Sequence, residues 1–132
     1  MSSEPLALVY HEASVKYDFG WGHPFRSDRF TSFMSLIRER GLLEDPRVSL
    51  VEPEAATERD LLLAPSREYM EGVREQAEAH TPLTGDTPLS PSIIEGALAI
   101  VGSSLRAAEL VAEGAVGVAE GVGGGLHHAG AW

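Results

Sequence analysis

The chain has 132 residues, with 20 acidic and 10 basic side chains, a net charge of -10 and no cysteine, and its length predicts one domain. The apolar content of 43% excludes a wholly disordered chain, the acidic balance argues against a nucleic-acid partner, and the lack of cysteine excludes disulfides and thiolate metal sites. The N-terminus resembles no secretory signal and no apolar run could span a membrane, so we expect a cytoplasmic protein without a membrane partner.

Short apolar segments alternate with helical patterns in the first half of the chain. Residues 6–10 predict a buried strand, and a loop rich in glycine, aromatic residues and histidine follows over residues 11–24. A helix with one apolar face is predicted by side chains at spacings of three and four, namely Phe30, Phe33, Met34 and Ile37. Gly41 is placed to end this helix, and residues 48–51 predict a second strand.

Helix-start signals follow the second strand. Thr57 with Asp60 resembles a capping box, and Ser66 is a plausible N-cap for a mostly polar helix that runs toward His80. Residues 81–91 contain three prolines and predict an irregular segment.

A long apolar helix is predicted next, beginning at a capping-box pattern of Ser92 and Glu95 and ending at Gly114. Its expected core face consists of Ile94, Ala97, Leu98, Val101, Leu105, Ala108 and Val111. A patch of small residues over 102–104 favours close packing on a sheet. Residues 115–119 predict a third strand, and a glycine-rich loop follows it.

The order of strand, helix, strand, several helices and strand predicts an α/β fold with an open, mainly parallel sheet and helices on both faces. Binding sites in such sheets form in loops beyond the carboxyl ends of the strands. Two glycine-rich loops, near Gly20 and near Gly124, follow predicted strands directly. We therefore look for chemistry in these loops.

The second of these loops contains His127 and His128 after three glycines. Imidazoles titrate near neutral pH, so a histidine pair at the end of a strand could take up and return a proton. Three alternatives remain open at this point: an exposed pair without a role, a simple metal pair, and a phosphate-binding glycine loop. The last lacks the helix start that a dinucleotide fingerprint requires.

The first loop and a later turn carry weaker signals. The residues from Tyr17 to Arg29 describe either a well-packed loop between a strand and a helix or the wall of a pocket. Arg29, on the first helical turn, is unfavourable for the helix dipole, so we expect an anion or carboxylate partner for it. Asp86 lies in a Gly-Asp-Thr-Pro sequence that is typical of a turn.

Taken together and in order, these motifs resemble the histone deacetylase family, and within it the bacterial acetoin-utilisation type. The resemblance spans residues 6–129. It rests first on a Gly-x-Gly-His-Pro loop at residues 20–24 and an early helical arginine, Arg29. A His/Ser-x-x-Tyr-hydrophobic pattern at 66–70, an Asp-x-Pro turn at 86–88 and a long helix with small residues at 102–104 follow. A Gly-Gly-x-His-His-Ala signature at 124–129 comes last.

The resemblance implies a zinc-dependent hydrolysis of an acetyl amide, on acetylated lysine or a small acetamide, within an arginase/deacetylase fold. It implies that His128 is the base for water and the proton donor to the leaving amine, while His127 supports the transition state electrostatically. Asp86 matches the carboxylate that holds the substrate backbone. Gly22, Pro24 and Arg29 match the lining of the pocket and its inner channel.

This chain departs from the family pattern after His128. The family's zinc ligands (an Asp, the His of an Asp-x-His step and a later Asp) and its tyrosine lie further along, and none of them is matched here. We therefore expect residues 1–132 to be the N-terminal part of a deacetylase domain that binds no zinc and is inactive alone. The alternatives are a non-enzymatic fragment or binding module that assembles with a separate C-terminal piece, or a nucleotide-binding protein.

Overall fold

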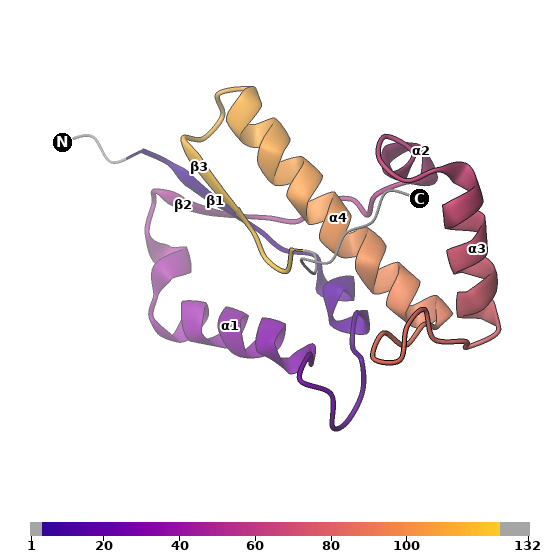
Figure 1. Ribbon diagram of the computed structural model, residues 1–132. Coiled ribbons are helices and arrows are strands. Elements are labelled where there is room, and N and C mark those ends of the chain that lie inside the picture. The colour runs from indigo at the N-terminus through magenta and orange to yellow at the C-terminus, as the bar shows by residue number, and fades with distance from the viewer. Residues whose placement is uncertain (1–3, 125–132) are drawn as a thin grey trace.

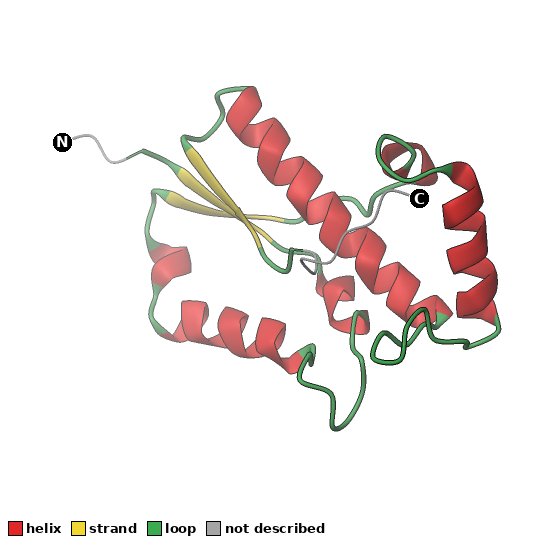
Figure 2. Ribbon diagram, in the orientation of Figure 1, coloured by secondary structure: helices red, strands yellow, loops and turns green. Residues whose placement is uncertain are grey.

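A computed structural model describes residues 4–124, which build a parallel three-stranded sheet with helices on its two sides (Figure 1). Figure 2 shows that the helices and strands alternate along the chain much as the sequence predicts. In chain order the elements are β1 (Leu6–Val9), η1 (Glu12–Lys16), α1 (Asp28–Glu39), η2 (Leu42–Glu44), β2 (Val48–Val51), α2 (Glu58–Leu61), α3 (Arg67–Glu78), α4 (Pro91–Ala112) and β3 (Val118–Gly121).

β1 is the central strand of the sheet, whose order is β2-β1-β3. Leu6 is in register with Val48 of β2 on one side and with Val118 of β3 on the other, and both pairings are parallel. Because all three strands run in one direction, their carboxyl ends meet at a single edge of the sheet. The loops that leave this edge are the place where a site is expected.

Alternate side chains of β1 point to opposite faces of the sheet and are buried against different helices. Leu8 packs with Phe30 and Met34 of α1, while Ala7 and Val9 pack with residues of α4 on the opposite face. The prediction of an open parallel sheet with helices on both faces is thereby confirmed. The predicted apolar face of α1 is confirmed in part, because the side chain of Phe33 is 39% exposed.

The expected start and core face of α4 are wrong. The helix begins at Pro91 after Ser90, whose hydroxyl accepts a hydrogen bond from the Ile93 N–H at 3.1 Å, and Glu95 instead forms an ion pair with Lys16. The buried face comprises Ile93, Gly96, Ala99, Ile100, Gly102, Ser103, Ala107 and Leu110. The helix is apolar on nearly every side, so periodicity alone could not select the face.

Small residues mark the face of α4 that approaches other backbone most closely. A Cβ on Gly102 would lie 2.1 Å from the carbonyl oxygen of Glu54, and one on Gly96 would lie 2.2 Å from the Tyr17 nitrogen. Ser103 is buried and its hydroxyl bonds to the Ala99 carbonyl at 2.9 Å. The prediction that residues 102–104 pack closely on the sheet is confirmed in part: Ser103 is buried beside Gly121 of β3, Gly102 packs on the segment after β2, and Ser104 is exposed.

Part of the larger apolar face predicted for α4 faces α3 instead of the sheet. Between α2, α3 and α4 lies an apolar groove of about 240 Å³, to which α4 contributes Ile94, Ala97, Leu98 and Val101. At the far end of the predicted face, Val111 is 44% exposed. α4 thus packs simultaneously on the sheet and on α3.

The third strand begins later than predicted, because the residues before it cap α4. Gly114 adopts a φ of 75°, its N–H bonds to the Val111 carbonyl, and the Ala115 N–H bonds to the Leu110 carbonyl at 3.0 Å. This pair of bonds is a Schellman motif, in which glycine is favoured because of its positive φ. The expected helix end is confirmed, and the strand covers Val118–Gly121 instead of residues 115–119.

Two further local predictions are confirmed. Thr57 and Asp60 form a reciprocal capping box at α2, and the Ser66 hydroxyl accepts from the Tyr69 N–H at the start of α3. Within residues 4–124, no helix combines the length and the apolar character needed to cross a bilayer.

Candidate functional site

The carboxyl edge of the sheet carries the loop after β1, the segment after β2 and the glycine-rich segment after β3. Val122 continues from β3 into the core, where it packs with Leu8 and Ile100, and its N–H bonds to the Val9 carbonyl at 2.9 Å. Gly123 and Gly124 follow. His127 and His128 come next in the sequence but lie outside the described residues, so their catalytic roles remain predictions.

The loop between β1 and α1 is fastened at its base by one carboxylate. Oδ2 of Asp18 accepts hydrogen bonds from the backbone N–H of Ser27 at 3.0 Å and from its hydroxyl at 2.6 Å, and Oδ1 accepts from the Gly20 N–H at 2.7 Å. The bonds from Ser27, followed by the one from Gly20, lower the pKa of Asp18 because they favour the ionised form.

Aromatic rings fill the inside of this loop. Tyr17, Phe19 and Phe25 form edge-to-face or tilted pairs with ring centroids 5.1–5.3 Å apart, and Phe25 also reaches Phe30 at 6.1 Å. Tyr17 and Phe25 pack against the core cluster around Leu8. Burial raises the pKa of Tyr17. These contacts favour the interpretation of residues 17–29 as a well-packed loop, which also makes it a firm support for exposed groups.

His23 connects this loop with the turn that contains Asp86. Its Nε2 lies 2.8 Å from the Asp86 carbonyl oxygen, although the two residues are 63 positions apart. The exposed Asp86 carboxylate accepts a hydrogen bond from the Thr84 hydroxyl at 2.9 Å. The structure therefore brings together two motifs that the sequence could only place in order.

Gly22 and Pro24 flank His23 in the loop, and Arg29 follows on the first turn of α1. The expectation of a carboxylate partner for Arg29 is not met within residues 4–124. Its guanidinium donates to the Pro24 carbonyl at 3.3 Å and lies 4.8 Å from the centre of the Phe25 ring. The nearby Asp28 pairs with Arg26 instead. Arg29 thus supports the loop while remaining exposed.

Sequence reasoning assigned no role to Asp18, to the His23 ring or to Trp21. The Asp-x-Gly spacing at 18–20 was an available signal, because Asp commonly bonds to backbone two residues further on. Trp21 is 91% exposed, with the Arg26 guanidinium 4.9 Å from its ring centre. No sequence signal pointed to the contact between His23 and Asp86, which depends on tertiary structure.

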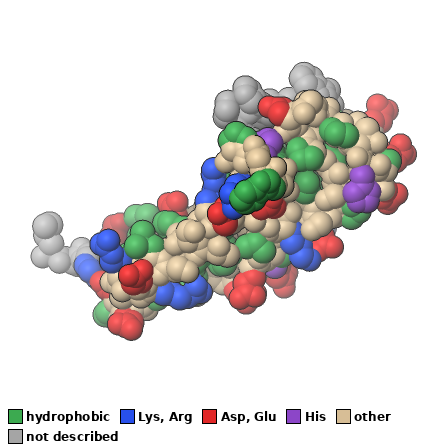
Figure 3. Space-filling model, turned by 90° about the horizontal axis from the view of Figure 1, so that it is seen from below, with side chains coloured by type: hydrophobic (Ala, Val, Ile, Leu, Met, Phe, Trp, Pro, Cys, Tyr) green, Lys and Arg blue, Asp and Glu red, His purple; other side chains and the backbone are tan. Residues whose placement is uncertain are grey.

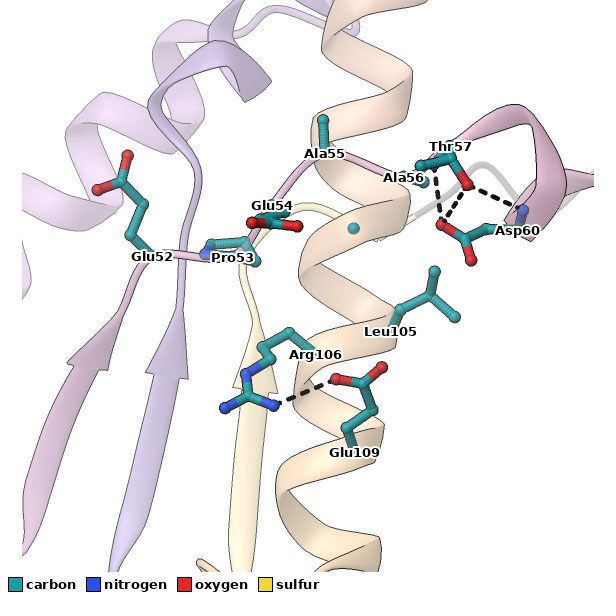
Figure 4. A pocket seen from close by; sticks show the side chains of 11 residues that line it. Glu52, Pro53, Glu54, Ala55, Ala56, Thr57, Asp60, Leu105, Arg106 and Glu109 are labelled. Carbon is teal, nitrogen blue, oxygen red and sulfur yellow. Dashed lines mark hydrogen bonds and ion pairs between the residues drawn. The ribbon is translucent and has the colours of Figure 1, made fainter.

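A second hollow of about 400 Å³ lies beside the segment after β2 (Figure 4). Four carboxylates contribute to its wall, but Asp60 is engaged by Thr57 and Glu109 by Arg106, as the dashed lines show. These bonds cap α2 and link neighbouring turns of α4. Two of its four carboxylates are therefore engaged in helix-stabilising contacts.

The described part of the chain contains no cluster of side chains that could form a metal site. Among residues 4–124, no three His, Cys, Asp or Glu side chains gather closely enough to hold a metal ion. Figure 3 shows acidic and basic side chains interspersed on the face that it presents. The absence of a nucleic-acid partner remains a prediction.

Comparisons with known proteins agree with these motifs. The histone deacetylase domain model matches residues 23–131, and the chain therefore belongs to the histone deacetylase family. It is 30% identical over 104 residues to a probable deacetylase of Archaeoglobus fulgidus, covering 79% of this chain and 29% of that protein. It is also 30% identical over 130 residues to the acetoin utilization protein AcuC of Bacillus subtilis, covering 92% of this chain and 33% of AcuC.

The fold also agrees with that of a solved structure. The crystal structure of the HDA15 HD domain superimposes with a TM-score of 0.76 at 18% identity, covering 89% of this chain and 34% of that chain. At this identity, the likeness concerns the fold alone. The chain spans about a third of the length of these relatives.

Proposed function

We propose that residues 1–132 form the N-terminal part of the catalytic domain of a zinc-dependent deacetylase, which hydrolyses an acetyl amide such as acetyl-lysine or a small acetamide. The observation that supports this proposal is the contact between His23 and Asp86, because it unites two of the family motifs that precede the tandem histidines in the sequence. The strand β3 ends at the same edge of the sheet and leads toward those histidines.

In this proposal the residues of the chain bind the substrate and move protons. Asp86 accepts hydrogen bonds from the substrate backbone, and Gly22, Pro24 and Arg29 line the pocket. His128 takes the proton of the attacking water and returns a proton to the leaving amine. His127 stabilises the negative charge that develops on the acetyl oxygen.

The side chains of residues 4–124 do not fit a zinc ion, because they offer no cluster of three possible ligands. Zinc would activate water and polarise the acetyl carbonyl in a complete family domain. We propose that its ligands are supplied by residues that follow the tandem histidines in such a domain. The 132-residue chain alone would then neither retain zinc nor hydrolyse acetyl amides.

This proposal is tested by metal analysis and by extension of the chain. The purified 132-residue protein, equilibrated with zinc at neutral pH, should retain far less than one ion per chain and should not deacetylate acetyl-lysine peptides or small acetamides. The DNA beyond the Trp132 codon should encode an Asp-x-His segment in this or a shifted frame, and the protein extended through it should bind zinc and be active.

The variant H128A of the extended protein should bind zinc normally but lose activity. Stoichiometric zinc in the 132-residue chain would show that it contains a complete metal site. An extended protein that holds zinc but cleaves no acetyl amide would refute the proposed activity.

The open edge of β3 supports a second candidate, in which the chain assembles with a separate C-terminal piece. Among the described residues, β3 pairs only with β1, and Val118 is 50% exposed. An edge strand presents unpaired backbone N–H and C=O groups, with which another strand could pair. Co-expression of the separate piece should restore zinc binding and activity; a complex without activity would favour a non-enzymatic binding role.

A further inference from the structure

We propose that His23 is a positioning residue, which holds the turn of Asp86 against the loop after β1. The proposal extends the proposed function, in which the Asp86 carboxylate holds the substrate backbone. It rests on the two hydrogen bonds made by the imidazole ring and on the anchoring of the loop that carries it.

The two ring nitrogens of His23 have different hydrogen-bond partners, and these partners determine which nitrogen of the neutral ring carries the proton. Nδ1 accepts a hydrogen bond from the Phe25 N–H at 2.9 Å, so this nitrogen carries no proton. A neutral imidazole then carries its proton on Nε2, which donates it to the Asp86 carbonyl at 2.8 Å. The ring of Phe19 meets the imidazole edge-on, with centroids 4.9 Å apart, and limits its rotation.

The turn of Asp86 is held together by hydrogen bonds among its own residues. The Leu83 N–H bonds to the Thr87 carbonyl at 2.9 Å, the Thr87 N–H bonds back to the Thr84 carbonyl, and the Thr84 hydroxyl reaches both Thr87 and Asp86. Within residues 4–124, the bond from His23 is the one hydrogen bond between this turn and the loop of residues 17–27.

The loop on the other side of this bond is fixed. The carboxylate of Asp18 ties its two ends together, and the rings of Tyr17 and Phe25 join it to the core. An imidazole supported in this way holds the exposed turn at a fixed position relative to the core. Without it, the turn would lose its place relative to the pocket wall, and its own hydrogen bonds, such as that of the Leu83 N–H to the Thr87 carbonyl, would open more often.

Two substitutions separate the bonds of His23. In H23Q, the side-chain amide nitrogen can occupy the place of Nε2 and still donate to the Asp86 carbonyl. In H23N, the shorter side chain can accept from the Phe25 N–H in place of Nδ1 but cannot reach Asp86. Both variants carry a side-chain amide and each keeps one of the two bonds, so their comparison shows on which bond a measured effect depends.

Amide hydrogen exchange of the 132-residue chain, followed by NMR, provides the first test. H23N should accelerate exchange of the Leu83 and Thr87 amides about fivefold, the equivalent of one ordinary hydrogen bond, while H23Q should restore the wild-type rates. The Ala56 amide, which bonds to the Leu98 carbonyl elsewhere, should be unaffected in both variants. Equal exchange at Leu83 and Thr87 in H23N and wild type would overturn the proposal.

The wild-type ring supplies a measurement that needs no folded variant. The ring ¹⁵N shifts of the neutral His23 imidazole should show a proton on Nε2 and none on Nδ1. The opposite tautomer would exclude both ring bonds and overturn the proposal.

Kinetics of the extended deacetylase separate this inference from the proposed function. H23N and D86N should each raise KM for an acetyl-lysine peptide more than they lower kcat, H23Q should restore KM, and H23N/D86N should be no worse than D86N. A normal KM in D86N, with the exchange effect present, would refute the substrate role of Asp86 but leave the His23 contact intact. A KM defect in H23N that H23Q does not rescue would refute positioning by His23.

Discussion

Asp18 and Ser27 close the loop after β1 through two hydrogen bonds to a single carboxylate oxygen, one from the Ser27 backbone and one from its hydroxyl. The loop between them contains His23, Trp21 and the glycines of the family motif. Its geometry therefore depends on a charged group that lies at its base and takes no part in the proposed chemistry.

Replacing Asp18 by asparagine should destabilise the chain by about 1 kcal/mol at pH 7, because one acceptor oxygen and its charge are lost. The pKa of Asp18 is lowered in the folded state, so its contribution is complete above its unfolded pKa of about 3.9 and disappears as the pH falls through the lower native value. Urea unfolding at a series of pH values measures the difference between wild type and D18N.

The exposed Glu71 of α3 provides the matched control, and E71Q should be nearly neutral at pH 7. A difference between wild type and D18N that stayed constant throughout the acid range would contradict the assigned role of the Asp18 charge.

Gly102→Ala should destabilise the chain by about 2 kcal/mol or more, because the new Cβ would overlap the Glu54 carbonyl oxygen and the backbone would have to move. Gly72 in α3 has open space around its Cβ position, so Gly72→Ala should stabilise by up to about 1 kcal/mol through helix propensity. Thermal unfolding of both variants measures the contrast. Equal effects would argue against the close packing of α4.

Ser90→Ala should cost about 1 kcal/mol, because the Ser90 hydroxyl is the N-cap of α4. Ser92→Ala should change stability by less than about 0.5 kcal/mol, since Ser92 is exposed on the first turn. Urea unfolding of this pair determines where α4 begins. A larger loss of stability in S92A than in S90A would show that α4 begins at Ser92, as the sequence predicts.

Arg47→Gln should raise the pKa of Asp45 from about 2 toward its ordinary value of 3.8. The Arg47 guanidinium donates to this carboxylate from Nε at 3.0 Å and from Nη2 at 2.7 Å, and these bonds are lost in the variant, whereas the bond from the backbone N–H of residue 47 remains. NMR titration of the Asp45 carboxyl carbon measures the shift. The attraction between the Asp45 carboxylate and Arg47 is present above pH 4 and is lost as the pH falls toward 2. A titration midpoint of Asp45 near pH 4 in the wild type would show that this ion pair is not formed in solution.

The sequence by itself determined the class of fold and the order of its motifs. Short apolar runs predicted the bounds of β1 and β2 to within one residue. The residue types at Thr57, Ser66 and Gly114 identified helix ends, because a helix cap is formed by residues that are neighbours in the chain. The ordered motifs indicated the histone deacetylase family, which the match over residues 23–131 confirms.

Tertiary structure alone decided which face of α4 is buried and how the motifs meet. α4 is apolar on nearly all sides, so its orientation follows from where Gly96 and Gly102 allow close backbone contact, which periodicity does not encode. His23 and Asp86 are 63 residues apart, and their contact exists only because folding brings the two loops together. Local sequence specifies local hydrogen bonds, whereas contacts between distant segments depend on how the helices pack on the sheet.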